Sequence, residues 1–168
     1  FTHALRCNDP VIFLEHKELL SSKSPVPEED YEIPFGKAAI VREGTDVTVV
    51  AIARMVQLSG EAAASMETEG ISVELIDPRT ISPLDTETIL TSVAKTGRLL
   101  IVDETFAPCG VGGEIAAQVI DQGFNDLDAP IKRLNGAHSP TPYSPSLEAA
   151  VVPNTEEIAA AIRDLMAE

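Results

Sequence analysis

The segment RLLIVDETFAPCGVGGEIAAQVI (Arg98–Ile120) decides the fold, because it joins a strand signal directly to a helix signal. Its first part, Arg98–Glu104, is a near-continuous apolar run, which is typical of a strand buried on both faces of a parallel sheet. From Gly110 onward, apolar and small residues recur at helical spacing. A buried strand that passes through a glycine turn into a helix predicts an α/β fold.

The same alternation extends to both sides of this segment. Further strands are predicted over residues 37–43, 47–53, 71–78 and 130–136, and helices over residues 54–70, 82–97, 110–124 and 154–168. The alternation predicts a three-layer open sheet of about five strands, mainly parallel. The short connection EGTD, which contains Gly44, predicts that the first two of these strands pair antiparallel as a hairpin.

Several residues have the chemistry of helix ends. Ser82 or Asp85 can cap the helix at 82–97, and Gly97 can end it. Asn154 with Glu157 three residues later has the spacing of a capping box.

The first 33 residues follow a different pattern. The opening FTHALRCNDP predicts the end of a helix and a turn, and VIFLEH (Val11–His16) predicts a strand. Residues 17–34 are rich in Ser, Pro and Glu without periodicity, as in a connector between domains. We therefore place a domain boundary near Pro34, with residues 1–33 as the end of a preceding domain plus linker and residues 34–168 as the main domain.

The formal net charge is −15, from 27 acidic and 12 basic residues. Nucleic-acid binding needs a basic patch, so this balance argues against it and against anionic membrane surfaces. There is no apolar run of membrane-spanning length and no basic-then-apolar start, so we expect neither a membrane span nor a signal peptide. Cys7 and Cys109 lack the spacing of a disulfide framework or a metal site, which favours a reducing cytoplasm. An acidic surface can instead attract a basic partner.

The stretch DETFAPCGVGGEI (Asp103–Ile115) admits three interpretations: a cofactor loop, a thiol active site or a packing device. Gly110, Gly112 and Gly113 do not complete the GxGxxG spacing, and Glu114 in the first helical turn would repel a phosphate. Cys109 precedes the helix without a basic neighbour in sequence to activate it. These features favour glycines that allow close packing of the helix.

Two further residues are candidates for binding or catalysis. Arg79 could clamp a carboxylate or phosphate, but Asp77 and Asp85 flank it and offer internal pairs. His138 is the one histidine of the regular domain, and no nucleophile or metal-type partner stands in register with it. The chain also contains no Walker, HExxH or GxSxG motif. The sequence thus favours a scaffold or assembly part.

Several motifs, taken in order, give the chain a family resemblance: PVIFLEHK, DVTVVAIARMV, VELIDPRTISPLD, KTGRLLIVDE, CGVGGEIAAQV and PTPYSPSLE. Together they resemble the beta subunit of thiamine-diphosphate-dependent 2-oxo acid dehydrogenases, a group that includes the pyruvate, branched-chain 2-oxo acid and acetoin dehydrogenases. The resemblance implies that residues 34–168 form a transketolase-like carboxy-terminal domain with one antiparallel edge strand. It also implies that residues 1–33 end a pyrimidine-binding domain.

The resemblance places the catalytic and cofactor-binding groups of such enzymes outside this chain. It therefore implies no catalytic, cofactor-binding or metal-binding residue here, although the intact enzyme uses thiamine diphosphate and Mg. Glu104, Gly110 and Glu114 match family positions near the subunit interface. We assign an interface or architectural role to these three and to Gly112, Gly113 and Arg79.

The implied partners are an alpha subunit, a second beta subunit and the small basic subunit-binding domain of the acyltransferase core. The expected function is subunit assembly and docking within an oxidoreductase, with the isolated chain inactive. Two alternatives remain open: a free-standing acidic interaction module, and a nucleotide binder that uses the Gly110 turn. The segment GAHSPTPYSPSLE favours acetoin or branched-chain substrates over pyruvate.

Overall fold

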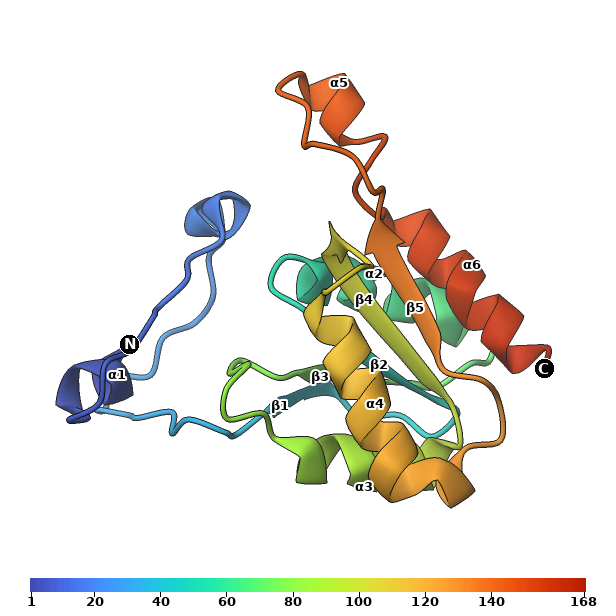
Figure 1. Ribbon diagram of the computed structural model, residues 1–168, viewed down its shortest axis with the longest axis horizontal. Helices are drawn as coiled ribbons and strands as arrows, with labels where there is room; N and C mark the ends of the chain where they lie inside the picture. Colours follow the sequence, from blue (N-terminus) through green and yellow to red (C-terminus); the bar gives the residue numbers. More distant parts are fainter.

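A computed structural model describes residues 1–168 and shows a five-stranded sheet between two layers of helices (Figure 1). The strands are β1 (Ala39–Arg42), β2 (Val47–Ala51), β3 (Val73–Asp77), β4 (Leu99–Phe106) and β5 (Lys132–Gly136). The main helices are α2 (Met55–Thr68), α3 (Thr86–Thr96), α4 (Val111–Gly123) and α6 (Thr155–Met166). Shorter pieces are α1 (Thr2–Arg6), η1 (Lys17–Ser21), η2 (Phe124–Asp126) and α5 (Pro145–Glu148).

The strand order is β1-β3-β2-β4-β5. Strand β2 pairs in parallel with β3 and β4, β4 pairs in parallel with β5, and β1 pairs antiparallel with β3 at the edge. The predicted sheet of five mainly parallel strands with one antiparallel edge strand is therefore confirmed.

The predicted hairpin between the first two strands is wrong, because β1 pairs with β3 and not with β2. The connection between them lies against the start of β3. The amide of Gly44 donates to Glu74 Oε2 at 3.2 Å, and the amides of Thr45 and Asp46 both donate to the carbonyl of Ser72. These contacts place β1 on the outer side of β3.

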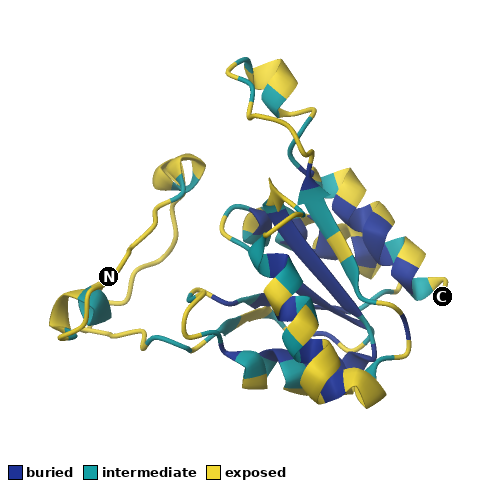
Figure 2. Cartoon of the chain, viewed as in Figure 1, coloured by how far each residue is buried: buried dark blue, intermediate teal, exposed yellow.

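Each face of the sheet has its own apolar core (Figure 2). One face packs on α2 and α6, and the residues at its centre include Val49, Leu75, Leu100, Met66 and Ile162. The other face packs on α3 and α4, with Val50, Ile76, Ile101, Ile89 and Ile115 among its buried members. Because β2, β3 and β4 bury side chains on both faces, their sequences read as apolar runs.

The predicted helix ends are present. Asp85, and not Ser82, caps α3 by accepting from the amide of Thr88 at 3.2 Å, and Gly97 ends that helix with φ of 68°. Asn154 and Glu157 form the full capping box of α6, with each side chain bonded to the other residue's amide at 3.0 Å. Local side-chain chemistry thus sets these boundaries.

The predicted strand at Val11–His16 is wrong, because these residues form no strand. A strand requires a neighbouring strand that accepts and donates its backbone hydrogen bonds, and no strand of this chain pairs with it. Ile12 and Leu14 are instead 89% and 85% exposed. In Figure 1, residues 1–35 run apart from the sheet on the left, and the segment with α5 projects from the top of the domain.

No helix of the chain combines the length and apolar character that crossing a membrane requires.

Candidate functional site

The carboxyl ends of β4 and β5 carry most of the residues that the sequence marks as functional. Asp103 is only 3% exposed, and its carboxylate accepts from the amide of Thr105 at 3.1 Å and from its hydroxyl at 2.7 Å. Asn135 of β5 donates to the carbonyl of Thr105 at 3.1 Å. These bonds hold the end of β4 rigidly, so the next residues leave the sheet in a fixed direction.

Glu104 is the first side chain beyond the buried part of β4, and it contacts the amino-terminal segment. Its Oε1 lies 2.7 Å from Nε2 of His16. Sequence reasoning missed His16, since the two residues are 88 positions apart and no local pattern connects them. Glu104 thus links the end of β4 to the amino-terminal segment within the chain.

The glycine turn allows close packing. A Cβ at Gly112 would lie 3.2 Å from Ile101 Cγ2 in β4, and one at Gly110 would lie 3.1 Å from the carbonyl oxygen of Phe106. A Cβ at Gly113 would meet Nη1 of Arg133 at 3.4 Å. Small residues here let α4 approach the sheet, which is the packing interpretation of DETFAPCGVGGEI.

The cofactor-loop and thiol interpretations find less support in the geometry of this turn. The amide of Gly110 donates to Ala107 O at 3.3 Å and that of Gly113 to Gly110 O at 3.0 Å, so both serve the turn itself. Glu114 accepts from Gln118 at 2.8 Å within α4. Cys109 is exposed with φ of 59° and makes no hydrogen bond through its thiol.

Arg79 lies just beyond the end of β3 and pairs with one of the two predicted carboxylates. Its amide donates to Asp77 Oδ1 at 3.0 Å, and its Nε is 3.7 Å from Asp77 Oδ2. Burial raises the pKa of Asp77, and the contacts with Arg79 offset this only in part. The predicted pairing with Asp85 is wrong, because Asp85 accepts from the amide of Ala38 at 2.9 Å and caps α3.

His138 follows β5 and is exposed. Its ring lies over Phe106 with centroids 5.0 Å apart and planes inclined by 36°. The stack joins the ends of β4 and β5 but brings no nucleophile or carboxylate to the imidazole.

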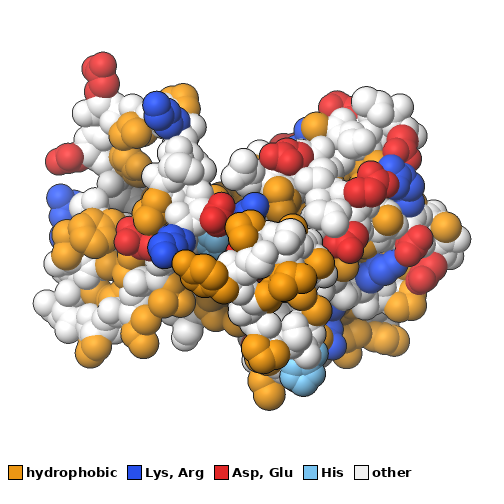
Figure 3. Space-filling view, turned by 90° about the horizontal axis from the view of Figure 1, so that it is seen from above, with side chains coloured by type: hydrophobic (Ala, Val, Ile, Leu, Met, Phe, Trp, Pro, Cys, Tyr) orange, Lys and Arg blue, Asp and Glu red, His pale blue; other side chains and the backbone are white.

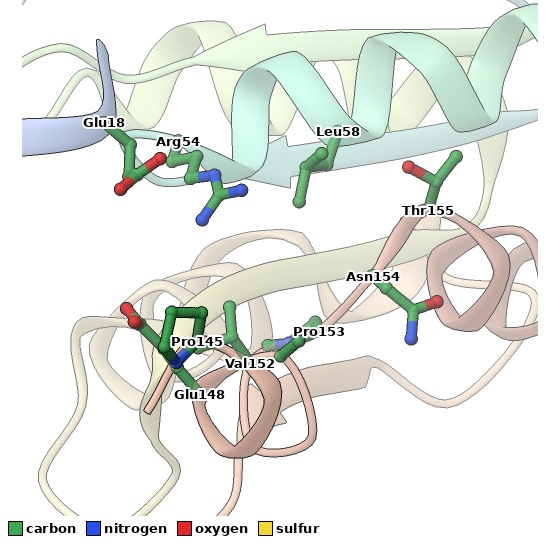
Figure 4. Close-up of a pocket in the computed structure, with 10 residues that line it drawn as sticks. Glu18, Arg54, Leu58, Pro145, Glu148, Val152, Pro153, Asn154 and Thr155 are labelled. Atoms are coloured by element: carbon green, nitrogen blue, oxygen red, sulfur yellow. The ribbon is translucent and has the colours of Figure 1, made fainter. Parts of the chain in front are cut away.

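A groove of about 300 Å³ opens between α2, η1 and the segment around α5 (Figure 4). Arg54 and Leu58 form one wall together with Glu18, and Pro145, Glu148 and Val152 face them from the other side. The guanidinium of Arg54 points into the groove. Sequence reasoning did not predict this groove, since its walls come from three distant segments.

A second, more apolar groove of about 590 Å³ lies where α4, η2 and the approach to β5 meet. Five of its eight lining residues are hydrophobic, and Phe124 at its rim is 64% exposed. Asp128 also lines it, and exposed Asp121 and Asp126 lie in the same stretch of chain. Figure 3 shows acidic side chains on both lobes of the face it presents, with Lys and Arg side chains among them.

No three His, Cys, Asp or Glu side chains of the chain lie close enough to hold a metal ion.

Comparison with known proteins identifies relatives over nearly the whole chain. It is 49% identical over 163 residues to the beta subunit of acetoin:2,6-dichlorophenolindophenol oxidoreductase of Cupriavidus necator, with 97% of this chain and 48% of the relative covered. The same subunit of Bacillus subtilis is 47% identical, with 98% and 48% covered. The mitochondrial pyruvate dehydrogenase beta subunit of pea is 46% identical, with 95% and 46% covered. The chain spans about half the length of these curated relatives.

A solved structure and a family match agree with the fold. An inactive beta4 tetramer of a split-gene transketolase superposes with a TM-score of 0.72 at 24% identity, over 86% of this chain and 46% of that one. The family described as transketolase, C-terminal domain, matches residues 36–158. With a mixed sheet, a packed glycine turn and a family match over most of its length, the chain belongs to the transketolase C-terminal domain family.

Proposed function

We propose that the chain is the carboxy-terminal half of the beta subunit of a thiamine-diphosphate-dependent 2-oxo acid or acetoin dehydrogenase. The observation that carries this proposal is the identity of 46–49% with acetoin and pyruvate oxidoreductase beta subunits over 95–98% of the chain. In this proposal residues 34–168 form the carboxy-terminal domain. Residues 1–33 are the end of the pyrimidine-binding domain plus the linker.

The proposed role is subunit assembly and docking rather than bond chemistry. Its partners are an alpha subunit, a second beta subunit and the acyltransferase component. Free Cys7 and Cys109 are compatible with a reducing cytoplasm. Acetoin is the first substrate to test, because two of the relatives act in acetoin oxidation by name.

Thiamine diphosphate is expected to bind the intact alpha–beta assembly and not the chain alone. The chain spans only about half the length of the beta-subunit relatives, and in this proposal the cofactor-binding groups lie on the rest of the assembly. Calorimetric titration of thiamine diphosphate with Mg²⁺ should give no heat of binding with residues 1–168. The same titration should saturate with the full-length beta subunit paired with its alpha subunit. Saturable binding to residues 1–168 alone would contradict this division of roles.

We propose the second groove as the docking surface for the basic subunit-binding domain. An apolar groove beside exposed aspartates can bury apolar side chains and attract cationic ones. The net charge of −15 adds a field that steers a basic partner towards the chain.

Asp126→Lys is expected to weaken binding of that basic domain about tenfold at low salt, since a rim charge of the wrong sign repels it. Binding should be measured by calorimetry at about 50 and 300 mM salt, where screening reduces the difference at the higher concentration. Asp9→Lys, an equal change of net charge in the amino-terminal segment, is the matched control and should have little effect. Equal weakening by both variants would show that only the total charge acts.

A further inference from the structure

The contact between His16 and Glu104 is the most protected point at which residues 8–34 touch the main domain. The two side chains are 19% and 27% exposed, and their Nε2 and Oε1 atoms are 2.7 Å apart. Between residues 8 and 34, every residue except His16 and Leu19 is exposed. The amino-terminal segment therefore meets the domain at this place, with Glu18 at the rim of the groove that contains Arg54.

The ring of His16 makes a second bond that fixes its protonation pattern. Nδ1 accepts from the amide of Glu18 at 3.3 Å, and His16 thereby caps η1. A nitrogen that accepts carries no proton, so in the neutral ring the proton lies on Nε2. Nε2–H can then donate to the carboxylate of Glu104, and one neutral imidazole satisfies both contacts.

Glu104, the partner of His16, lies at the end of a closely packed, buried strand. Glu104 follows a run of five buried β4 residues, Leu99–Asp103. Gly136 packs so closely against Glu104 that a Cβ at position 136 would lie 2.2 Å from the carbonyl oxygen of Glu104. By contrast, the side chains of Ile12 and Leu14, just before His16, are exposed to solvent. The contact thus joins a fixed strand end to the point where the apolar run ends and η1 begins.

We propose that His16 and Glu104 are a positioning pair that fixes how the polypeptide before residue 16 is oriented relative to the main domain. The Nε2–H group of His16 donates to the carboxylate, and its Nδ1 accepts from the Glu18 amide and so caps the first turn of η1. Loss of the carboxylate frees the ring to rotate and to exchange tautomers, and both bonds weaken together. The pair acts through geometry and takes no part in bond chemistry.

Two measurements on residues 1–168 test this proposal without any cofactor or activity. The first is the ¹⁵N spectrum of the His16 imidazole, which distinguishes a protonated Nε2 with bare Nδ1 from the opposite tautomer. The second is hydrogen exchange of the Glu18 amide, whose acceptor is the His16 ring. In the wild-type chain we expect the Nε2–H tautomer and a protected Glu18 amide.

Three variants separate positioning from mere surface change. Glu104→Ala removes the acceptor, and we expect Glu18 exchange to rise about five- to tenfold with mixed tautomers, the size expected for a partly exposed charge-assisted bond. Glu104→Gln keeps an acceptor oxygen and should restore most of the protection. Glu114→Ala, which removes an exposed carboxylate bonded only within α4, should change neither signal.

The amides of β4 serve as an internal reference, because they report whether each variant keeps its fold. His16→Ala, outside the apolar core, gives a second route to the same loss if Glu104→Ala fails to fold. An Nδ1–H tautomer in the wild-type chain would overturn the proposal. Equal Glu18 exchange in the wild-type, Glu104→Ala and His16→Ala chains would also overturn it. Neither result depends on whether the intact protein is a dehydrogenase.

Discussion

Alanine at position 44 is expected to cost the chain about 4 kcal/mol or more of unfolding free energy. A Cβ at Gly44 would lie 2.1 Å from the carbonyl carbon of Val73 and 2.2 Å from the amide nitrogen of Glu74. These are backbone atoms of β3, held on both sides by pairing with β1 and β2, so they cannot move aside. Because a domain of this size has a stability of only about 5–15 kcal/mol, the variant should be largely unfolded on mild heating.

Gly60→Ala is the matched control, since it adds the same methyl group elsewhere. Gly60 lies inside α2, and the nearest foreign atom to its Cβ would be Leu75 Cδ2 at an ordinary 3.8 Å. Alanine is better than glycine within a helix by about 1 kcal/mol, so this variant should be slightly more stable than the wild type. Urea unfolding followed by circular dichroism measures both variants. A loss of stability of similar size in both would contradict the role given to the close approach at Gly44.

Lys95→Met is expected to destabilise the chain by about 2 kcal/mol at neutral pH, because it leaves a carboxylate in the sheet without its cation. Glu74 is 1% exposed, and its carboxylate accepts from Lys95 and from the amide of Gly44. The Lys95 side chain is 40% exposed, so solvent screens the pair and the loss falls below the 3–5 kcal/mol typical of fully buried pairs. Urea unfolding at pH 7 gives the difference directly.

The same difference should shrink in acid, and its sign follows from the pKa of Glu74. Burial on its own would raise that pKa, but hydrogen bonds from Lys95, Ser92 and the Gly44 amide outweigh it and lower the pKa below 4.5. The stabilisation is therefore complete above pH 4.5 and is lost as the pH falls through the lower folded-state value. Glu74→Gln/Lys95→Met removes both charges and serves as the control. A Lys95→Met effect of equal size at pH 7 and pH 3 would contradict this account.

Much of the fold could be predicted because its signals are local. The caps at Asp85 and Asn154 lie within three residues of the groups that they bind, and Gly97 ends α3 through its own φ angle. The apolar run of β4 reports burial on both faces, whichever strands lie beside it. Such features need only the neighbouring residues, so they can be read from the sequence.

Strand pairing could not be predicted in the same way. The short connection at Gly44 has the length of a hairpin loop, but its amides bond to Glu74 and Ser72, some thirty residues on in the chain. The antiparallel partner of β1 is therefore β3, a choice made by tertiary contacts. Val11–His16 has the composition of a strand but has no strand to pair with in this chain, and composition alone carries no such information.

The candidate site likewise contains residues whose role could be predicted from local sequence and residues whose role depends on tertiary contacts. The packing role of Gly112 follows from a small residue at a strand-to-helix turn, which the sequence displays. His16 and Arg54 could not be identified in that way. The residues that lie beside each of them are brought there by the fold from far along the chain. Only the three-dimensional arrangement places an imidazole on Glu104 or a guanidinium in the groove.

The irregular edge of β1 has a consequence for the protein in concentrated solution. The register of β1 shifts between Ile40 and Arg42, and the opposite edge strand, β5, begins with Lys132 and Arg133. A broken register and edge cations both hinder the addition of a foreign strand. Contacts between copies at high concentration are therefore expected to involve helices or loops and not a shared sheet. Thioflavin-binding fibrils are not expected to form from the folded state.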